Sequence, residues 1–180
     1  FDPAAFVPIT VMGALPNVLI ASKKSQIQTL PAMIAFAKAN PRKVAFGSSG
    51  IGSTYHLGSE LFAAQTGTQL THVPYKGEGP ALVDLMAGRV DLFVGNVSAV
   101  LKFRQERKVK FLAMASARRS NNAPDVPTTA EAGLPGFEAS AWFALVAPPG
   151  TPAPIASKLQ KMKTVRKICQ SLNRRTKAHL

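Results

Sequence analysis

The sequence predicts an α/β fold built on a mainly parallel sheet, and three observations lead to this prediction. Apolar segments of strand length alternate with segments of helical periodicity between residues 17 and 117. The loops between them are short. Two of these loops, GSSG at residues 47–50 and YKG at residues 75–77, directly follow apolar segments. This alternation implies right-handed crossovers and places ligands at the carboxyl ends of the strands.

The composition is that of a globular protein. The 180 residues are 46% hydrophobic and 17% charged, which suits one domain of ordinary size or two small lobes. Apolar runs are too short to predict a membrane-spanning helix. The chain opens with FDP at residues 1–3, without a charged segment followed by an apolar one, so we expect no signal peptide in this chain. A secreted origin remains compatible with this opening.

The charge is concentrated in one segment. Of the 22 Lys and Arg residues behind the net charge of +13, eight lie in residues 158–180, which contain no acidic residue. This basic segment is not interleaved with aromatic residues and follows no DNA-binding motif, which argues against a nucleic-acid partner. The single cysteine, Cys169, predicts neither an intrachain disulfide nor a Cys-rich metal site. His56, His72 and His179 do not have a metal-ligand spacing, so we expect no metal and no cofactor.

The first elements are two strands and a helix. Residues 6–10 and 17–21 are predicted strands. Thr29 can cap the helix, Pro31 suits its first turn, and residues 40–41 (NP) end it, because proline disfavours a helical residue before it. The predicted buried face comprises Leu30, Ile34 and Ala37.

The next strand and helix carry the first glycine-rich loop. Residues 44–47 are a predicted strand, and Ser53 or Thr54 begins a helix that Gly67 ends as its C′ glycine. Residues 69–73 form the following strand. The predicted buried stripe of this helix comprises Leu57, Leu61 and Ala64.

The remaining α/β elements follow the second loop. Pro80 is predicted to open a helix that ends at Gly88, and residues 90–94 and 110–115 complete the strands. The apolar positions of this helix are Leu82, Leu85 and Met86.

The chain changes character after residue 117. TTAE at residues 128–131 is a capping box, which predicts a short helix closed by Gly133. Residues 138–147 are a predicted strand that carries Trp142, which we expect to pack in a hinge or core rather than line a cleft. Thr151 and Pro152 are the predicted cap and first position of a last helix.

The two loops predict a binding site rather than a catalytic one. A loop rich in Gly, Ser or Lys before a helix directs backbone N–H groups to a place where the helix dipole favours negative charge. We therefore predict a cleft for a small anion such as a carboxylate. The alternatives are ordinary turns that need glycine, a solvated Lys76, and histidines that only pack; Asn96 suits a helix cap or a ligand donor equally. The chain has no nucleophile elbow and no acid–base pair, so we do not expect an enzyme.

Several motifs together resemble the Bug/TctC family, the substrate-binding proteins of tripartite tricarboxylate transporters. The resemblance extends from residue 1 to about residue 159. The motifs that carry it are FDP at residues 1–3, PNVL at 16–19, GSSG at 47–50 with His56, HVPYKG at 72–77, PDVPT at 124–128, EAGLPG at 131–136 and APPGTP at 147–152.

The resemblance implies a two-lobed, type II periplasmic binding-protein fold that closes on a small organic acid and delivers it to membrane permease subunits. It implies a periplasmic monomer whose second lobe, residues 17–140, is largely complete. Residues 1–16 and 141–160 would be remnants of a partial first lobe and the hinge strands. The ligand-binding residues expected from the loops and the resemblance are Ser48, Ser49, Gly50, Gly52, Ser53, Thr54, Pro74, Tyr75, Lys76, Gly77 and Asn96.

The chain departs from the family pattern at three places. A Pro-Gly-Gly loop that grips one carboxylate from the first lobe has no counterpart before Phe1, so we expect weak binding by this chain alone. Gly95 stands where many relatives have an acidic residue. The basic tail, residues 161–180, does not match the mixed-charge helix of relatives, and our hypothesis is that it is an aberrant, frame-shifted end. Resequencing the source gene would test this.

Three other functions remain as alternatives. An effector-binding sensor module shares the two-lobed architecture, although the chain has no helix-turn-helix. An α/β enzyme would use Ser49 or His56. A basic interaction protein would act through its tail and would bind oligonucleotides in a salt-dependent manner.

Overall fold

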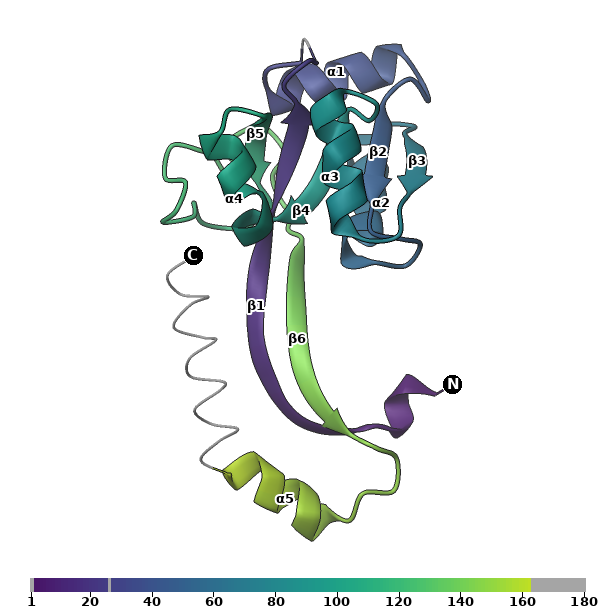
Figure 1. Cartoon of the computed structure of the whole chain (residues 1–180), viewed down its shortest axis with the longest axis vertical. Coiled ribbons are helices and arrows are strands. Elements are labelled where there is room, and N and C mark those ends of the chain that lie inside the picture. Colours follow the sequence, from purple (N-terminus) through teal and green to yellow (C-terminus); the bar gives the residue numbers. More distant parts are fainter. Residues whose placement is uncertain (1, 26, 163–180) are drawn as a thin grey trace.

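The computed structural model describes residues 2–25 and 27–162, which form a compact α/β body and a long two-stranded ribbon (Figure 1). Most of the basic tail, with Cys169 and His179, lies outside the described residues. None of the described helices is long and apolar enough to span a bilayer. In chain order the elements are η1 (Pro3–Ala5), β1 (Val7–Ser22), α1 (Leu30–Ala39), β2 (Ala45–Ser48), α2 (Thr54–Thr66), β3 (Thr71–Pro74), α3 (Glu78–Ala87), β4 (Leu92–Asn96), α4 (Val97–Gln105), β5 (Val109–Met114), β6 (Ser140–Ala147) and α5 (Ala153–Lys161).

The sheet of the body is mixed. Its strand order is β3-β2-β4-β1-β5, with β2 parallel to β3 and β4. β1 runs antiparallel to both β4 and β5, so the sheet is less uniformly parallel than predicted. The reason is that an apolar segment indicates a buried strand but not the direction in which it enters the sheet.

β1 is one strand of 16 residues where the sequence predicted two. Its first half pairs with β6 to form the ribbon, and its second half, from Asn17, pairs with β4 and β5. Gly13 and Pro16 favour an interruption of the strand. They are tolerated because, in the described structure, each strand of the ribbon has one open edge. Register shifts beside Pro8 and Val11 absorb the irregularity.

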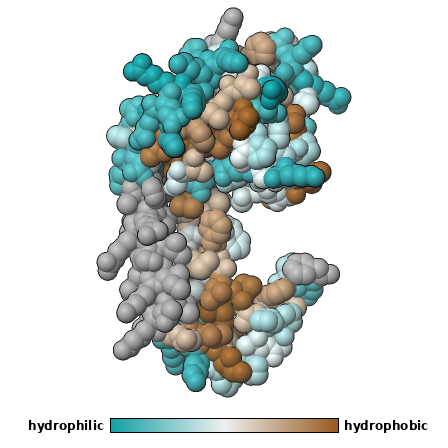
Figure 2. All heavy atoms as spheres, viewed as in Figure 1, coloured by the Kyte–Doolittle hydropathy of each residue, from teal (hydrophilic) through white to brown (hydrophobic). Residues whose placement is uncertain are grey.

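The ribbon exposes apolar side chains. Figure 2 shows apolar surface around its far end, below an open hollow on one side of the ribbon. Trp142, which was expected in a hinge or a core, is 66% exposed on β6, so it does not pack in a core, and a place in the hinge stays a prediction. The ribbon buries little because, among the described residues, its far end has only a small cluster, formed by Ile9 of β1, Ala147 of β6 and Ala156 of α5.

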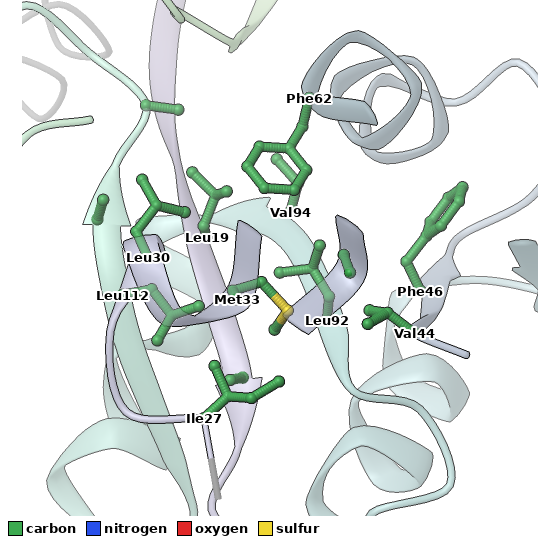
Figure 3. Close-up of a cluster of buried hydrophobic side chains, with 14 of the residues drawn as sticks. Leu19, Ile27, Leu30, Met33, Val44, Phe46, Phe62, Leu92, Val94 and Leu112 are labelled. Atoms are coloured by element: carbon green, nitrogen blue, oxygen red, sulfur yellow. The ribbon is translucent and has the colours of Figure 1, made fainter. Parts of the chain in front are cut away.

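Two apolar cores lie on the two faces of the sheet. α1 and α2 cover one face (Figure 3), and α3 and α4 cover the other. The predicted cap of α1 is confirmed, because the Thr29 hydroxyl accepts a hydrogen bond from the Ala32 N–H at 3.3 Å. Leu30 and Ala37 are buried as predicted, with Met33 beside them and Ile34 at the margin.

The buried face of α2 differs from the prediction. Leu57 and Leu61 are 57% and 40% exposed, and Ala64 is exposed as well. Phe62 faces the core instead and packs edge-on against Phe137, with ring centroids 5.9 Å apart. The helix approaches the sheet through Gly58, where an added Cβ would lie 3.2 Å from Val94. Glycine and serine give no apolar signal, so the sequence pattern pointed to the neighbouring face.

Four smaller differences concern the helices. α3 begins at Glu78 rather than at the predicted proline, and α4 was not predicted as an element. The capping box forms, since Thr128 and Glu131 exchange hydrogen bonds of 2.7 and 3.2 Å, but only a turn follows it rather than a helix. α5 begins at Ala153, and the Thr151 hydroxyl bonds the Pro148 carbonyl instead of capping the helix.

Candidate functional site

Three helices begin at one edge of the sheet. β2, β3 and β4 are parallel neighbours, and α2, α3 and α4 follow their carboxyl ends (Figure 1). The last residues of β2 and β3, Ser48 and Pro74, are register partners. The two loops singled out in the sequence therefore lie side by side. This edge is where open α/β sheets bind ligands.

The β2–α2 turn is held by its own hydrogen bonds. The buried Ser48 hydroxyl accepts from the Gly50 N–H at 3.2 Å and lies 2.7 Å from His72 Nε2. Gly50 and Gly52 have φ values of 131° and 78°, which require glycine. Ser53 caps α2, because its hydroxyl accepts from the His56 N–H at 3.2 Å. Ser49 is half-buried, and Thr54 is exposed at the first position of the helix.

The β3–α3 loop is joined to this turn. The Tyr75 N–H donates to the Ser48 carbonyl at 3.0 Å. The Tyr75 hydroxyl donates to Asp84 at 2.7 Å, and burial together with that carboxylate raises the pKa of Tyr75 to about 12. Gly77, at φ 117°, is the N-cap of α3 and leaves the helix without a side-chain cap. Pro74 and Lys76 are exposed.

Asn96 serves as a helix cap. Its side-chain oxygen accepts from the Ser98 N–H at 3.0 Å at the start of α4. Asn17 is its register partner on β1, where the ribbon joins the body. The Asn17 side chain is 1% exposed, and neither of its amide atoms has a hydrogen-bond partner among the described residues. Asn17 was predicted only as the first residue of a strand, because the local sequence does not show that its amide is buried where the ribbon joins the body.

Free donors remain at this edge. The first N–H groups of a helix have no acceptor within the helix, and the helix dipole makes that end attractive to anions. The described structure provides no acceptor for four backbone N–H groups at the starts of α2 and α3. These belong to Thr54, Tyr55, Glu78 and Gly79.

Tyr55 and Glu78 connect the two helix starts, and neither residue was predicted from the sequence as part of the site. The Tyr55 hydroxyl donates to Glu78 Oε2 at 3.2 Å, and its ring packs against Phe93 at 5.2 Å. Burial raises the pKa of Glu78, and the Tyr55 hydrogen bond opposes this. Burial also raises the pKa of Tyr55 above its usual range. A carboxylate thus stands within a site whose backbone favours anions.

The described residues include no group of three or more His, Cys, Asp or Glu side chains that could hold a metal ion. The site offers free backbone N–H donors at two helix starts, where the helix dipoles favour negative charge. Such groups suit the binding of a small anion.

The comparison with protein families identifies the chain's relatives. A sequence model described as "Tripartite tricarboxylate transporter family receptor" matches residues 2–173. The chain belongs to this family. The match extends beyond residue 159, where the resemblance was expected to end, and so includes part of the basic tail.

Relatives with curated sequences cover most of this chain. BugT of Bordetella pertussis is 45% identical over 81% of the chain and 44% of its own length. A UPF0065 protein in the tcbD-tcbE intergenic region of Pseudomonas sp. strain P51 is 40% identical over 86% of the chain and 46% of its own length. The chain therefore spans about half the length of the curated relatives it matches.

Solved structures share the fold. Rpa4515 of R. palustris with adipate has a TM-score of 0.80 at 35% identity, covering 99% of this chain and 66% of that one. MatC of Rhodopseudomonas palustris with bound malate has a TM-score of 0.78 at 31% identity, covering 93% and 60%. The periplasmic binding protein BugD has a TM-score of 0.77 at 30% identity, covering 93% and 58%. The receptor family thus has the type II periplasmic binding-protein fold that the sequence predicted.

Proposed function

We propose that this chain binds a small organic acid with one or more carboxylates at the edge where α2, α3 and α4 begin. The observation that carries the proposal is the juxtaposition of these helix starts with free N–H donors from α2 and α3. Family membership supports it, as do the relatives whose structures contain adipate and malate. The ligand would then be delivered in the periplasm to the permease of a tripartite tricarboxylate transporter by a monomeric, non-catalytic receptor.

The donors contact the ligand through the main chain in this proposal. These donors are the free N–H groups of Thr54 and Tyr55 at the start of α2 and of Glu78 and Gly79 at the start of α3. Hydrogen bonds from N–H groups to a carboxylate contribute about 1.5–3 kcal/mol each, so each lost donor weakens binding about 10- to 100-fold. No general base is needed, because nothing is deprotonated.

The test removes one N–H group without disturbing the helix. Thr54 is the first residue of α2, where proline is favoured, and Ser53 has φ −66° and ψ 157°, which a following proline accepts. We expect Thr54→Pro to weaken malate or adipate binding in calorimetry while the unfolding midpoint stays close to that of the wild type. Thr54→Ala is the matched control, because it removes the hydroxyl and keeps the N–H.

Two outcomes would count against the proposal. The absence of binding by the wild type to malate, adipate and other di- and tricarboxylates would refute carboxylate capture. Equal affinities of Thr54→Pro and Thr54→Ala would refute the role of the α2 N–H groups. The same titration tests the expectation that this chain alone binds weakly, which a submicromolar affinity would contradict.

A further inference from the structure

Two histidine rings pack against each other beside the β2–α2 turn. His56, in the first turn of α2, and His72, on β3, have ring centroids 4.1 Å apart at an interplanar angle of 33°. The buried Phe46 ring stacks on His72 at 4.8 Å and 17°. Both histidines also form hydrogen bonds to the turn itself, so their protonation and the shape of the turn are coupled.

His56 holds the turn through an atom that cannot be protonated without breaking the contact. The Gly52 N–H donates to His56 Nδ1 at 3.2 Å, so Nδ1 carries no proton. The neutral ring therefore carries its proton on Nε2, which lies 3.7 Å from Glu60 Oε1. A second proton has to bind at Nδ1, where it would meet the Gly52 N–H.

His72 contacts the same turn through the Ser48 hydroxyl. Its Nε2 lies 2.7 Å from the Ser48 hydroxyl, which also contacts the Gly50 N–H and carbonyl at 3.2 Å. With a neutral His72 that accepts at Nε2, the Ser48 proton points to the ring. Protonation turns Nε2 into a donor, so the Ser48 proton has to rotate toward the Gly50 carbonyl.

The pair also resists carrying two charges. Two positive charges at this separation repel each other. The carboxylate that interacts electrostatically with both rings is that of Glu60, which is about half exposed. Burial lowers the pKa of His72, the neighbouring His56 lowers it further, and Glu60 opposes both. The neutral form of His72 is therefore the state that the fold favours.

We propose that His56 and His72 form a proton-sensitive switch that holds the β2–α2 turn in its ligand-binding shape when neutral and releases it when protonated. The inference rests on the proposed function. Acidification breaks the Gly52 contact and rearranges the Ser48–Gly50 contacts, so the turn loosens and a bound carboxylate is released. The pair thus makes ligand release sensitive to pH over the range in which histidines titrate.

The test compares the pH dependence of binding in isosteric variants. In His56→Asn the side-chain oxygen takes the place of Nδ1 and accepts from Gly52, and in His72→Gln the amide takes the place of Nε2 beside Ser48. Neither side chain titrates. Affinities for malate and adipate are measured by calorimetry from about pH 8 to about pH 5. The titration of the ligand is the same in every protein, so differences between variants report on the histidines alone.

We expect the wild type to lose about tenfold more affinity on acidification than His56→Asn. Identical pH profiles for the wild type and both variants would overturn the proposal, and so would an affinity of the wild type that rises on acidification relative to the variants. If no acid binds at any pH, the proposed function fails by itself. The switch is then read in the free protein by NMR, where the Gly50 and Gly52 amide signals should titrate together with the histidine rings. Amide signals that do not follow the rings would refute it.

Discussion

Substitution of Gly95 directly tests how tightly the core around Phe93, next to the site, is packed. An added Cβ at this position would lie 2.4 Å from Cε1 and 2.7 Å from Cδ1 of Phe93. The Phe93 side chain is fully buried and packs against the Tyr55 ring at 5.2 Å, so it has no free space to enter. Gly95→Ala should therefore displace the ring or the strand.

The magnitude follows from overpacking. Forcing an extra methyl group into a packed core costs about 1–3 kcal/mol. Replacing glycine by alanine offsets about 0.4–1 kcal/mol of this, because it restricts the unfolded chain. We expect a net loss of about 1–2 kcal/mol, which for a domain of this size lowers the unfolding midpoint by about 2–8 °C.

The assay is urea unfolding of Gly95→Ala, Phe93→Leu and the double variant. A smaller side chain at position 93 should accommodate the new methyl group, so the double variant should be more stable than the sum of the single losses by about 1 kcal/mol. Gly79→Ala is the matched control, because a Cβ there has no neighbour within 4 Å and α3 favours alanine. Unchanged stability of Gly95→Ala, or strictly additive losses, would refute the argument.

Three further predictions concern the helices and the capping box. Phe62→Ala should lower the free energy of unfolding in urea by about 3–5 kcal/mol, because it leaves a cavity against Phe137. Leu61→Ala, on the exposed face of α2, should change it by less than about 1 kcal/mol. Equal losses in the two variants would contradict the observed buried face of α2. Ser53→Ala should cost about 1 kcal/mol through loss of the α2 cap, and Ser53→Asp should retain it, as circular dichroism during unfolding would show. The Arg119 hydrogen bond lowers the pKa of Glu131 below its ordinary value of 4.5, so its stabilising contribution is present above that pH and is lost as the pH falls. Glu131→Gln should therefore be less stable than the wild type at neutral pH, with a difference that closes in acid; a difference that persists there would contradict this assignment.

The sequence predicted those features that depend on residues three to five positions apart. Thr29 and Ser53 cap their helices, and Gly67 and Gly88 end theirs with φ values of 64° and 79°, because each cap is a contact within one turn. The position of both loops at strand ends could be predicted for the same reason. The order of the sequence motifs also indicates the receptor family.

The sequence by itself thus determined the class of fold, the ends of α1 and α2, and the loops that form the candidate site. Only the tertiary structure decided the direction of β1, the buried face of α2, and the contacts of Tyr55 with Glu78 and of His56 with His72. The physical reason is distance along the chain. A cap needs only its own helix, whereas a buried face or a cross-strand contact depends on which distant segments pack there. Gly58 illustrates this, because it lets α2 approach the sheet on a face other than the one that the apolar pattern predicted.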